Sequence, residues 1–446
     1  MSFKKSILQE IVKLAIPITI GQLGFMLMGF ADTVMLGKYS TIEMSAASFG
    51  NVVFFQVIIF GMGLLFAVST LVSISIGEEK PEKSIGIFYS SILLSFLLSI
   101  VLYIILYILI ENIHWFGQTE TIGLLGGQYL YIVNFSTPFI IFFTCSKQLM
   151  DGYSKTKVSM YITFIGLSLN ILLNWILIFG HFGFEKMGLI GAAWATTIAR
   201  FVMMVLMIST IFANKDFRFY QTIYIEKKSY LKDLLKLGVP IGFSFFFEIF
   251  AFSTGLIMAG WISEIALAAH QIAFNIASLT YMFVTGIAAA ASIIVGNYYG
   301  SKNKEAIKTT FIQTIKLTLF IEVIFVILLF ALYAKIPLIY TKDVEVIALS
   351  TGLVILSAFF QVSDGIQAVV GGCLRGIKDT KFIGIISFFS YCIIMIPGAY
   401  FLSFYLNLGV KGIWYSFIIG LTFAAIFMVY RFYYKTFKKS IIFEDA

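Results

Sequence analysis

The chain has 446 residues, of which 60% are hydrophobic and only 12% are charged. Because a water-soluble globular protein carries about a quarter of its residues as charges, this composition excludes a water-soluble domain of this size. The net charge of +8 would suggest a nucleic-acid partner in a soluble protein, but the basic residues lie in short loops between apolar segments, so we expect the lipid bilayer and not nucleic acid as their partner.

Apolar stretches of at least about 18 residues can cross a bilayer as helices, and the chain contains twelve of them. In chain order they are expected at 14–36, 47–76, 86–110, 123–146, 158–180, 189–213, 237–260, 270–298, 309–333, 345–371, 382–405 and 409–430. The first stretch is too long for a signal-peptide core and no clear cleavage pattern follows it, so we interpret it as a retained membrane helix. The sequence therefore predicts an all-α, multi-pass membrane protein.

Positive charges divide unequally between the two sides of this arrangement. With both termini in the cytoplasm, the tails and inner loops hold 25 of the 31 Lys and Arg residues, and Arg200 lies inside a span. The outer loops hold the other five, which are Lys38, Lys186, Lys335, Lys342 and Lys411. Because basic residues concentrate on the cytoplasmic side, we expect a cell-membrane protein with cytoplasmic N- and C-termini.

The chain repeats itself at an offset of 223 residues. Lys13-Leu-Ala-Ile-Pro17 matches Lys236-Leu-Gly-Val-Pro240 at this offset. Further pairs at the same offset are Ser40 and Ser263, Ala46 and Ala269, and Gly77 and Gly300. This agreement indicates that six helices are duplicated. Because six is even, both copies begin on the same side and form parallel repeats about an axis along the membrane normal.

The repeat divides the chain into two lobes. We expect an N-lobe at residues 1–213, a cytoplasmic linker at 214–235 and a C-lobe with a short cytoplasmic tail at 236–446. Two six-helix lobes leave a central cleft, and rocking of the lobes would give alternating access. Pro17 and Pro240 occupy the same place in both copies and should bend or weaken their helices, so we interpret them as hinges.

The sequence lacks the motifs of an enzyme or an ATP-driven pump. It has neither a GxxxxGK[ST] phosphate-binding loop nor a GxSxG nucleophile motif. His114, His181 and His270 lack metal-ligand spacing, and the three cysteines make no CxxC pair. We therefore expect no catalysis and no cofactor, with transport driven by an ion gradient or running downhill.

Ionisable residues within a span cost about 2.5–3.5 kcal/mol on insertion scales and mark candidate functional sites. Five qualify, namely Asp32, Arg200, Glu248, Glu322 and Asp364. The helical rise places Glu248 and Asp364 about 18 and 16 Å from the inner surface, and Gln361 and Gln367 share the helix face of Asp364. Two carboxylates at one depth can bind a sodium ion or share a proton. The alternative is two unrelated structural carboxylates.

A second candidate site lies in the N-lobe. Asp32 and Asn174 are level, at about 28 and 26 Å from the inner surface, and Asn170 shares the face of Asn174 at about 20 Å. The repeat has Gly255 in place of Asp32, so the lobes differ chemically. The alternative is a gating or packing hydrogen bond.

Two further charges are harder to assign. Arg200 lies mid-span near Thr196 and Thr197, and we expect it to pair with an acidic group. Glu322 lies mid-span with Lys316 six residues earlier, which is off its helix face, and we assign it no role.

Several segments of the sequence, taken together, are typical of one transporter family. They are Pro17, Ala31-Asp-Thr-Val-Met-Leu-Gly37 and its repeat, Gly191-Ala-Ala-Trp-Ala-Thr196, Glu248, Asp364, and Gly376 through Lys381. In this combination the chain resembles, over essentially its whole length, the multidrug and toxic compound extrusion (MATE) transporters of the NorM-type bacterial branch. The resemblance implies a V-shaped pair of six-helix lobes that exports drugs in exchange for sodium ions or protons, and we expect a monomer.

The resemblance also implies site residues. Glu248 and Asp364 match the ion-binding carboxylates of the C-lobe, where a sodium ion is the only metal we expect. Asp32, Asn170 and Asn174 match the polar cluster of the N-lobe.

Substrate contacts follow from the same resemblance. Gln271 and Phe252 stand where the branch lines its cavity, and Asp343 stands where it places an outer acidic residue that contacts cationic drugs. We place Phe360 in the same set, although the branch often carries there a tyrosine that supports the ion. Lys342 replaces a second outer acidic residue, which weakens the outer contact.

These observations favour a cation-coupled (Na+ or H+) antiporter of small cationic or amphipathic compounds. A flippase or exporter of lipid-linked or sugar substrates is the alternative, and the acids at the midplane argue against such an anionic cargo. A membrane-embedded enzyme or scaffold is disfavoured because no catalytic constellation is present.

Overall fold

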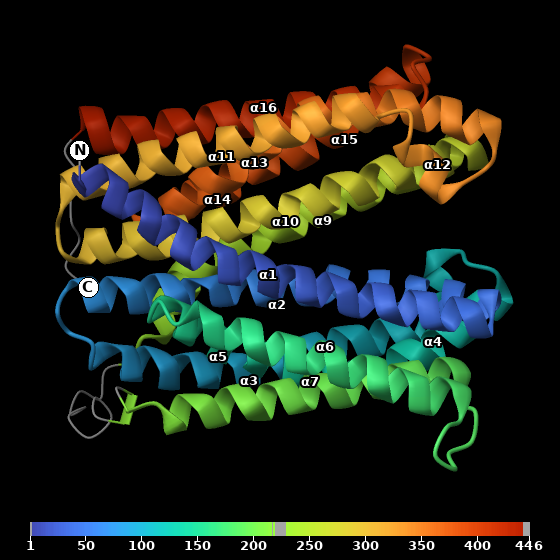
Figure 1. Cartoon of the computed structure of the whole chain (residues 1–446), viewed down its shortest axis with the longest axis horizontal. Coiled ribbons are helices and arrows are strands. Elements are labelled where there is room, and N and C mark those ends of the chain that lie inside the picture. The colour runs from blue at the N-terminus through green and yellow to red at the C-terminus, as the bar shows by residue number, and fades with distance from the viewer. Residues whose placement is uncertain (1, 216, 219–228, 440–446) are drawn as a thin grey trace. The chain divides into compact units, whose positions relative to one another are not determined.

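The computed structural model of the chain describes residues 2–215, 217–218 and 229–439, and these residues form helices and connecting loops without a strand (Figure 1). Eleven helices are long and apolar enough to cross a membrane singly, and a bent pair supplies a twelfth span. The twelve predicted spans are therefore confirmed within the described part of the chain.

The first half of the chain holds α1 (Ser2–Tyr39), α2 (Thr41–Gly77), α3 (Lys83–Glu111), α4 (Glu120–Asn134), α5 (Thr137–Gly152), α6 (Thr156–Phe179) and α7 (Gly188–Ala213). The second half holds α9 (Leu231–Ile262), α10 (Glu264–Gly300), α11 (Lys304–Leu332), α12 (Ile336–Tyr340), α13 (Val344–Gly376) and α16 (Val410–Tyr433). The span at Thr380–Tyr405 is one helix that widens to π-helical turns at Phe388–Met395 and Phe401–Tyr405.

One predicted span is wrong in shape. The stretch 123–146 was expected to be a single helix, but α4 and α5 meet at an angle of 49°. The break precedes Pro138, which has no N–H to donate and restricts the residue before it. The hydroxyl of Ser136 donates to the carbonyl of Val133 at 2.6 Å within the break.

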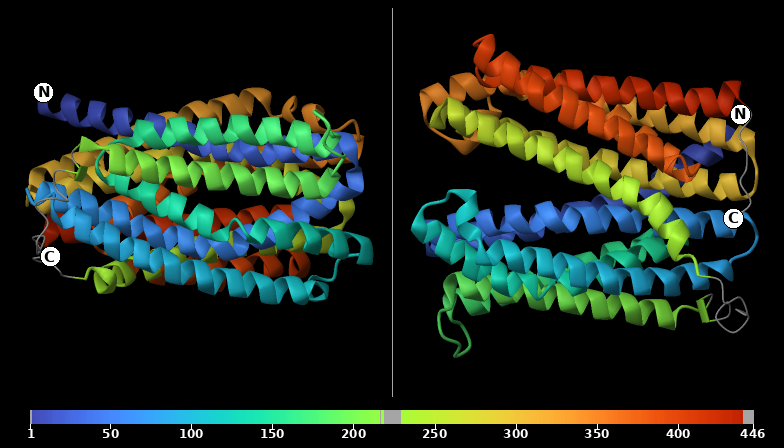
Figure 2. Two further views of the ribbon diagram at one scale, coloured as in Figure 1. Left: turned by 90° about the horizontal axis from the view of Figure 1, so that it is seen from below. Right: turned by 180° about the vertical axis from the view of Figure 1, so that it is seen from behind.

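The chain forms two compact units, which we name by their larger segments. The N-terminal unit is Ile20–Gly242, and the C-terminal unit is Met1–Thr19 with Phe243–Ala446. Within each unit the long helices run side by side (Figure 2). These limits differ from the predicted lobe boundaries at 213 and 236, which stay a prediction, because the first half of α1 packs in the C-terminal unit and the first third of α9 packs in the N-terminal unit.

Burial explains both exchanges. On α1, Ile7 and Ile11 are buried in one apolar cluster with Val284 and Ile287 of α10. On α9, Gly238 approaches the N-terminal unit so closely that a methyl group there would lie 2.5 Å from the carbonyl oxygen of Leu64. Such contacts allow no side chain larger than hydrogen.

The sequence repeat is also a structural repeat. Helices α2 and α10 begin after Ser40 and Ser263 and end at Gly77 and Gly300. Each serine hydroxyl accepts a hydrogen bond from the backbone N–H three residues later, at 3.3 and 3.0 Å, which caps the helix. The two-copy prediction is thus confirmed at the level of helix ends.

Packing repeats as well. A methyl group at Gly152 would lie 2.8 Å from Cβ of Val72, and one at Gly376 would lie 2.7 Å from Cβ of Val295. The two valines are related by the offset of 223 residues and the two glycines by 224. The same close helix contact is therefore built twice from one sequence pattern.

Candidate functional site

The two carboxylates predicted for the C-terminal unit lie on different helices and are both buried. Glu248 of α9 is 6% exposed and Asp364 of α13 is 4% exposed. Their charges interact, so the structure brings them together as expected. Tyr281 of α10 donates its hydroxyl to Oε1 of Glu248 at 2.9 Å. In contrast, Oδ1 of Asp364 is buried without a hydrogen-bond partner among the described residues.

Two tyrosines, a glutamine and one arginine lie near the acidic pair of Glu248 and Asp364. Tyr391 interacts with Glu248, and its hydroxyl accepts from Nε2 of Gln367 at 3.1 Å. Arg375 attracts the charge of Glu248. Sequence reasoning missed Tyr281 and Tyr391, because an isolated tyrosine in an apolar span carries no signal that distinguishes it from a packing residue.

The polar cluster predicted for the N-terminal unit is assembled around Asp32. Asn174 donates to Oδ1 of Asp32 at 2.5 Å, and Thr196 donates to Oδ2 at 2.9 Å. Asn170 links the two donors, since it donates to Thr196 and accepts from Asn174, each at 3.3 Å. All four side chains are at most 3% exposed. The predicted proximity of Asp32, Asn170 and Asn174 is therefore seen, and Thr196 completes the ring.

Arg200 does not have the acidic partner that we expected. Its Nη1 donates to Ser136 at 2.7 Å, and its guanidinium lies 4.6 Å from the centre of the Phe54 ring. No ion pair to Arg200 occurs among the residues that the structure describes. The hydroxyl and the ring face stabilise the cation instead, although Asp32 also attracts it.

The two candidate sites differ in how well their acids are satisfied. Both oxygens of Asp32 accept hydrogen bonds, whereas one oxygen of Asp364 accepts none from described residues. A buried polar atom without a partner costs about 1–3 kcal/mol. The acid of the C-terminal site therefore has unused capacity to hold a cation, whereas the acid of the N-terminal site is satisfied and the unpartnered atom there is Oδ1 of Asn174.

The hydrogen bonds to Asp32 predict a stability effect. Asp32→Ala removes one acceptor from Asn174, which still donates to Asn170, and the acceptor of the buried Thr196 hydroxyl, so we expect a loss of about 1–3 kcal/mol. Thermal unfolding of the purified protein measures it. Glu185→Ala, at an exposed loop position of the same unit, serves as the control, and unfolding of both variants at the wild-type temperature would contradict this account of Asp32.

The four predicted substrate contacts have different surroundings in the structure. Phe252 and Phe360 belong to a buried aromatic cluster, with ring centres 5.8 Å apart, and Phe360 is only 2% exposed. Gln271 is exposed on α10. Asp343 caps α13, because its carboxylate accepts from the backbone N–H groups of the second and third following residues at 2.9 and 3.3 Å. Phe360 and Asp343 thus have local structural roles in this conformation.

The predicted hinges lie where the chain changes units. The helices run through Pro17 and Pro240 without a break. The unit boundary falls two residues after each proline, following Thr19 and Gly242. A proline removes one helical hydrogen bond, so each crossing adjoins a weakened turn.

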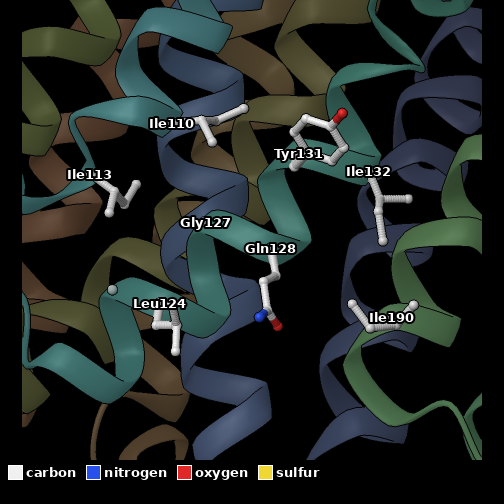
Figure 3. Close-up of a pocket in the computed structure, with 9 residues that line it drawn as sticks. Ile110, Ile113, Leu124, Gly127, Gln128, Tyr131, Ile132 and Ile190 are labelled. Atoms are coloured by element: carbon white, nitrogen blue, oxygen red, sulfur yellow. The ribbon is translucent and has the colours of Figure 1, made fainter.

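An apolar cavity of about 410 Å³ lies elsewhere in the N-terminal unit (Figure 3). It lies between the end of α3, α4 and the start of α7, and its only polar side chains come from Gln128 and Tyr131. None of the predicted site residues lines it. Across the described ranges, no group of three or more His, Cys, Asp or Glu side chains is placed to hold a metal ion.

Comparison with known proteins places this arrangement in a family. The MatE family model matches the chain twice, over residues 17–176 and 240–401. The chain is 33% identical to the probable multidrug resistance protein NorM of Bacillus cereus over 431 residues, which are 95% of this chain and 94% of that protein. It is also 33% identical to NorM of Mannheimia succiniciproducens over 438 residues, covering 95% and 93%.

Solved structures share the fold. An outward-facing multidrug resistance transporter of the MATE family superposes with a TM-score of 0.88 at 24% identity, covering 97% of each chain. A eukaryotic MATE transporter gives a TM-score of 0.89 at 16% identity, covering 96% of each chain. The two family-model matches start at Pro17 and Pro240. The distance between these two starts equals the 223-residue offset of the internal repeat.

Proposed function

The chain belongs to the MatE family of transporters, and from this premise we propose that it exports cationic or amphipathic drugs from the cell in exchange for sodium ions or protons. Its relatives are named multidrug resistance proteins, which supports drugs as the cargo. The distribution of basic residues supports placement in the cell membrane with both termini in the cytoplasm. We propose that one chain suffices for the cycle.

The observation that carries the coupling proposal is the unpartnered oxygen of Asp364 beside Glu248. Two buried carboxylates repel each other unless a cation or a proton lies between them. Arg375 can offset only one of the two charges. Entry of a coupling ion therefore stabilises this pair, and departure of the ion leaves an excess negative charge that favours a cationic drug.

Alternating access requires a change between an inward-open and an outward-open state, and we place the bending for this change at the helix turns that contain Pro17 and Pro240. Because each unit boundary lies two residues after Pro17 or Pro240, a change in helix bend there would reorient one unit against the other. The polar cluster of Asp32, Asn170 and Asn174 is a second candidate ion site in this scheme. Gln271, Phe252, Phe360 and Asp343 are proposed to meet the drug in a conformation that also exposes the two phenylalanines.

Labelled ethidium, a flat aromatic cation, tests the proposal in everted membrane vesicles. In these vesicles the outer face of the protein points inward, so sodium ions or protons loaded inside should drive ethidium into the lumen. Vesicles without the protein, and vesicles with the gradient collapsed, are the controls. Equal accumulation with and without each gradient would contradict ion-coupled export. Movement of a lipid-linked sugar without ethidium transport would favour the flippase.

A further inference from the structure

One face of α11 is polar although most residues of this helix are apolar. Thr310, Thr314, Thr318 and Glu322 follow each other at four-residue spacing and all are buried. Each threonine hydroxyl donates to the backbone carbonyl four residues earlier, at 2.6 to 2.9 Å. The threonine hydroxyls therefore find their hydrogen-bond acceptors within α11 itself. Glu322 lies on the same buried face of the helix.

Glu322 reaches α13 through a gap at Gly365. A methyl group at Gly365 would lie 2.6 Å from Oε1 of Glu322 and 3.2 Å from its carboxyl carbon. The glycine thus makes the room that the carboxyl group occupies, directly next to Asp364 in the chain. At 2% exposure, Glu322 is shielded from solvent, and α11 packs against α13 along this contact.

The carboxyl groups at this contact lack partners. Oε2 of Glu322 and Oδ1 of Asp364 are both buried without a hydrogen bond from any residue that the structure covers. Gln361, one turn before Asp364, has an amide oxygen in the same condition. Three unused oxygens on two facing helices are suitable ligands for a small cation.

The charged groups around this contact have an excess of acids that a cation would balance. Asp364 is repelled by both Glu248 and Glu322. The nearby basic group is Arg375, which interacts with Glu248, and Lys316 of α11 is exposed. The other titratable groups here are the hydroxyls of Tyr281 and Tyr391, which interact with Glu248 and Asp364. Among the described residues these three carboxyl groups share one guanidinium, so their full ionisation would leave two negative charges without a counter-charge.

We propose that Glu322 and Asp364 form a second cation-binding pair at the contact of α11 with α13, and that this pair takes one monovalent cation, a sodium ion or a proton. The inference rests on the proposed function and extends it to a second coupling cation in each cycle. Because no three acids of the described residues converge on one point, Glu322 adds a separate position beside Glu248 and does not complete a single three-acid site.

The ethidium gradient at which net flux stops tests this proposal. The test uses reconstituted vesicles held at zero membrane potential. There the ratio of ethidium inside to ethidium outside, once net flux stops, is multiplied by the imposed cation ratio once for each cation exchanged per ethidium. Under a tenfold gradient we expect Glu322→Gln to lower that ratio about tenfold, which corresponds to one cation fewer. Separate sodium and pH gradients show which ion uses the pair. A purely structural role would slow transport without moving this equilibrium ratio.

Matched variants sharpen the test. Gly365→Ala should lower the ratio as Glu322→Gln does, because its methyl group displaces the carboxyl group. Gly352→Ala on the same helix, where a methyl group would meet only Cε of Lys411 at 3.7 Å, should leave it unchanged. Glu305→Gln, at a site on α11 with 78% exposure, is the matched control for Glu322→Gln.

The outcomes separate the two proposals. An unchanged ratio in Glu322→Gln overturns the second cation site, while ion-driven transport by the wild type would still support the proposed function. Should Glu322→Gln fail to insert, Gly365→Ala decides alone, and a wild-type ratio in that variant overturns the inference. Failure of the wild type to respond to either gradient would instead remove the proposed function itself.

Discussion

Replacing Glu248 with glutamine, or Asp364 with asparagine, is expected to reduce gradient-driven ethidium accumulation to the level of vesicles that lack the protein. Each change preserves the shape of the side chain and removes the charge that holds the coupling ion. Both positions are buried inside spans, where a neutral amide costs less than a carboxylate. We therefore expect normal insertion together with loss of coupling, measured as labelled ethidium uptake per amount of inserted protein.

Exposed acids of the same unit control for the loss of charge in general. Glu264→Gln at the start of α10 and Glu345→Gln at the start of α13 both lie at exposed positions and should transport at the wild-type rate. Wild-type accumulation in both Glu248→Gln and Asp364→Asn would sink the proposal that these carboxylates couple transport.

Gly372→Ala is expected to produce a large loss of stability in the C-terminal unit. A methyl group at Gly372 of α13 would overlap the carbonyl oxygen of Ala288 and lie 3.0 Å from its carbonyl carbon. Because the obstacle is the backbone of α10, it cannot turn aside as a side chain would. Overpacking costs about 1–3 kcal/mol, and we expect the upper end of that range from thermal unfolding.

The neighbouring glycine provides a close control. A methyl group at Gly371 would meet only side-chain ends, Nη1 of Arg375 at 3.9 Å and Sδ of Met428 at 4.0 Å, so Gly371→Ala should unfold near the wild-type temperature. Equal unfolding temperatures for the two variants would show that α10 and α13 are not packed as closely as the structure has them.

The number and order of the spans could be predicted because the length of an apolar stretch alone decides whether it crosses a bilayer. The repeat could be predicted for a different reason, since Ser40 and Ser263 still cap equivalent helices. The break ahead of Pro138 was missed because the stretch 123–146 is apolar throughout. The exchange of helix segments between units was missed because it depends on which buried faces meet, as for Ile11 and Val284.

In the candidate sites, too, some features could be predicted from the sequence and others depend on how the helices pack. Counting the helical rise placed Asp32 level with Asn174, and the two are hydrogen-bonded at 2.5 Å. The partners of Arg200 could not be found in this way, because Ser136 lies in the unpredicted break between α4 and α5 and Phe54 lies on α2. Glu322 had no assigned role in the sequence because its neighbour Gly365 becomes informative only once α11 and α13 are seen together.

The proposed exchange of ion for drug through Glu248 and Asp364 is tested most directly by adding ethidium to the purified protein loaded with the coupling ion. In the sodium arm the released sodium-22 is counted, and in the proton arm the pH change of a weakly buffered solution is recorded. The wild type should release ions in at least one of the two arms, and Glu248→Gln should release fewer in that arm, because only the pair of Glu322 and Asp364 remains. Release from Glu248→Gln equal to that of the wild type would contradict the assignment of the coupling site.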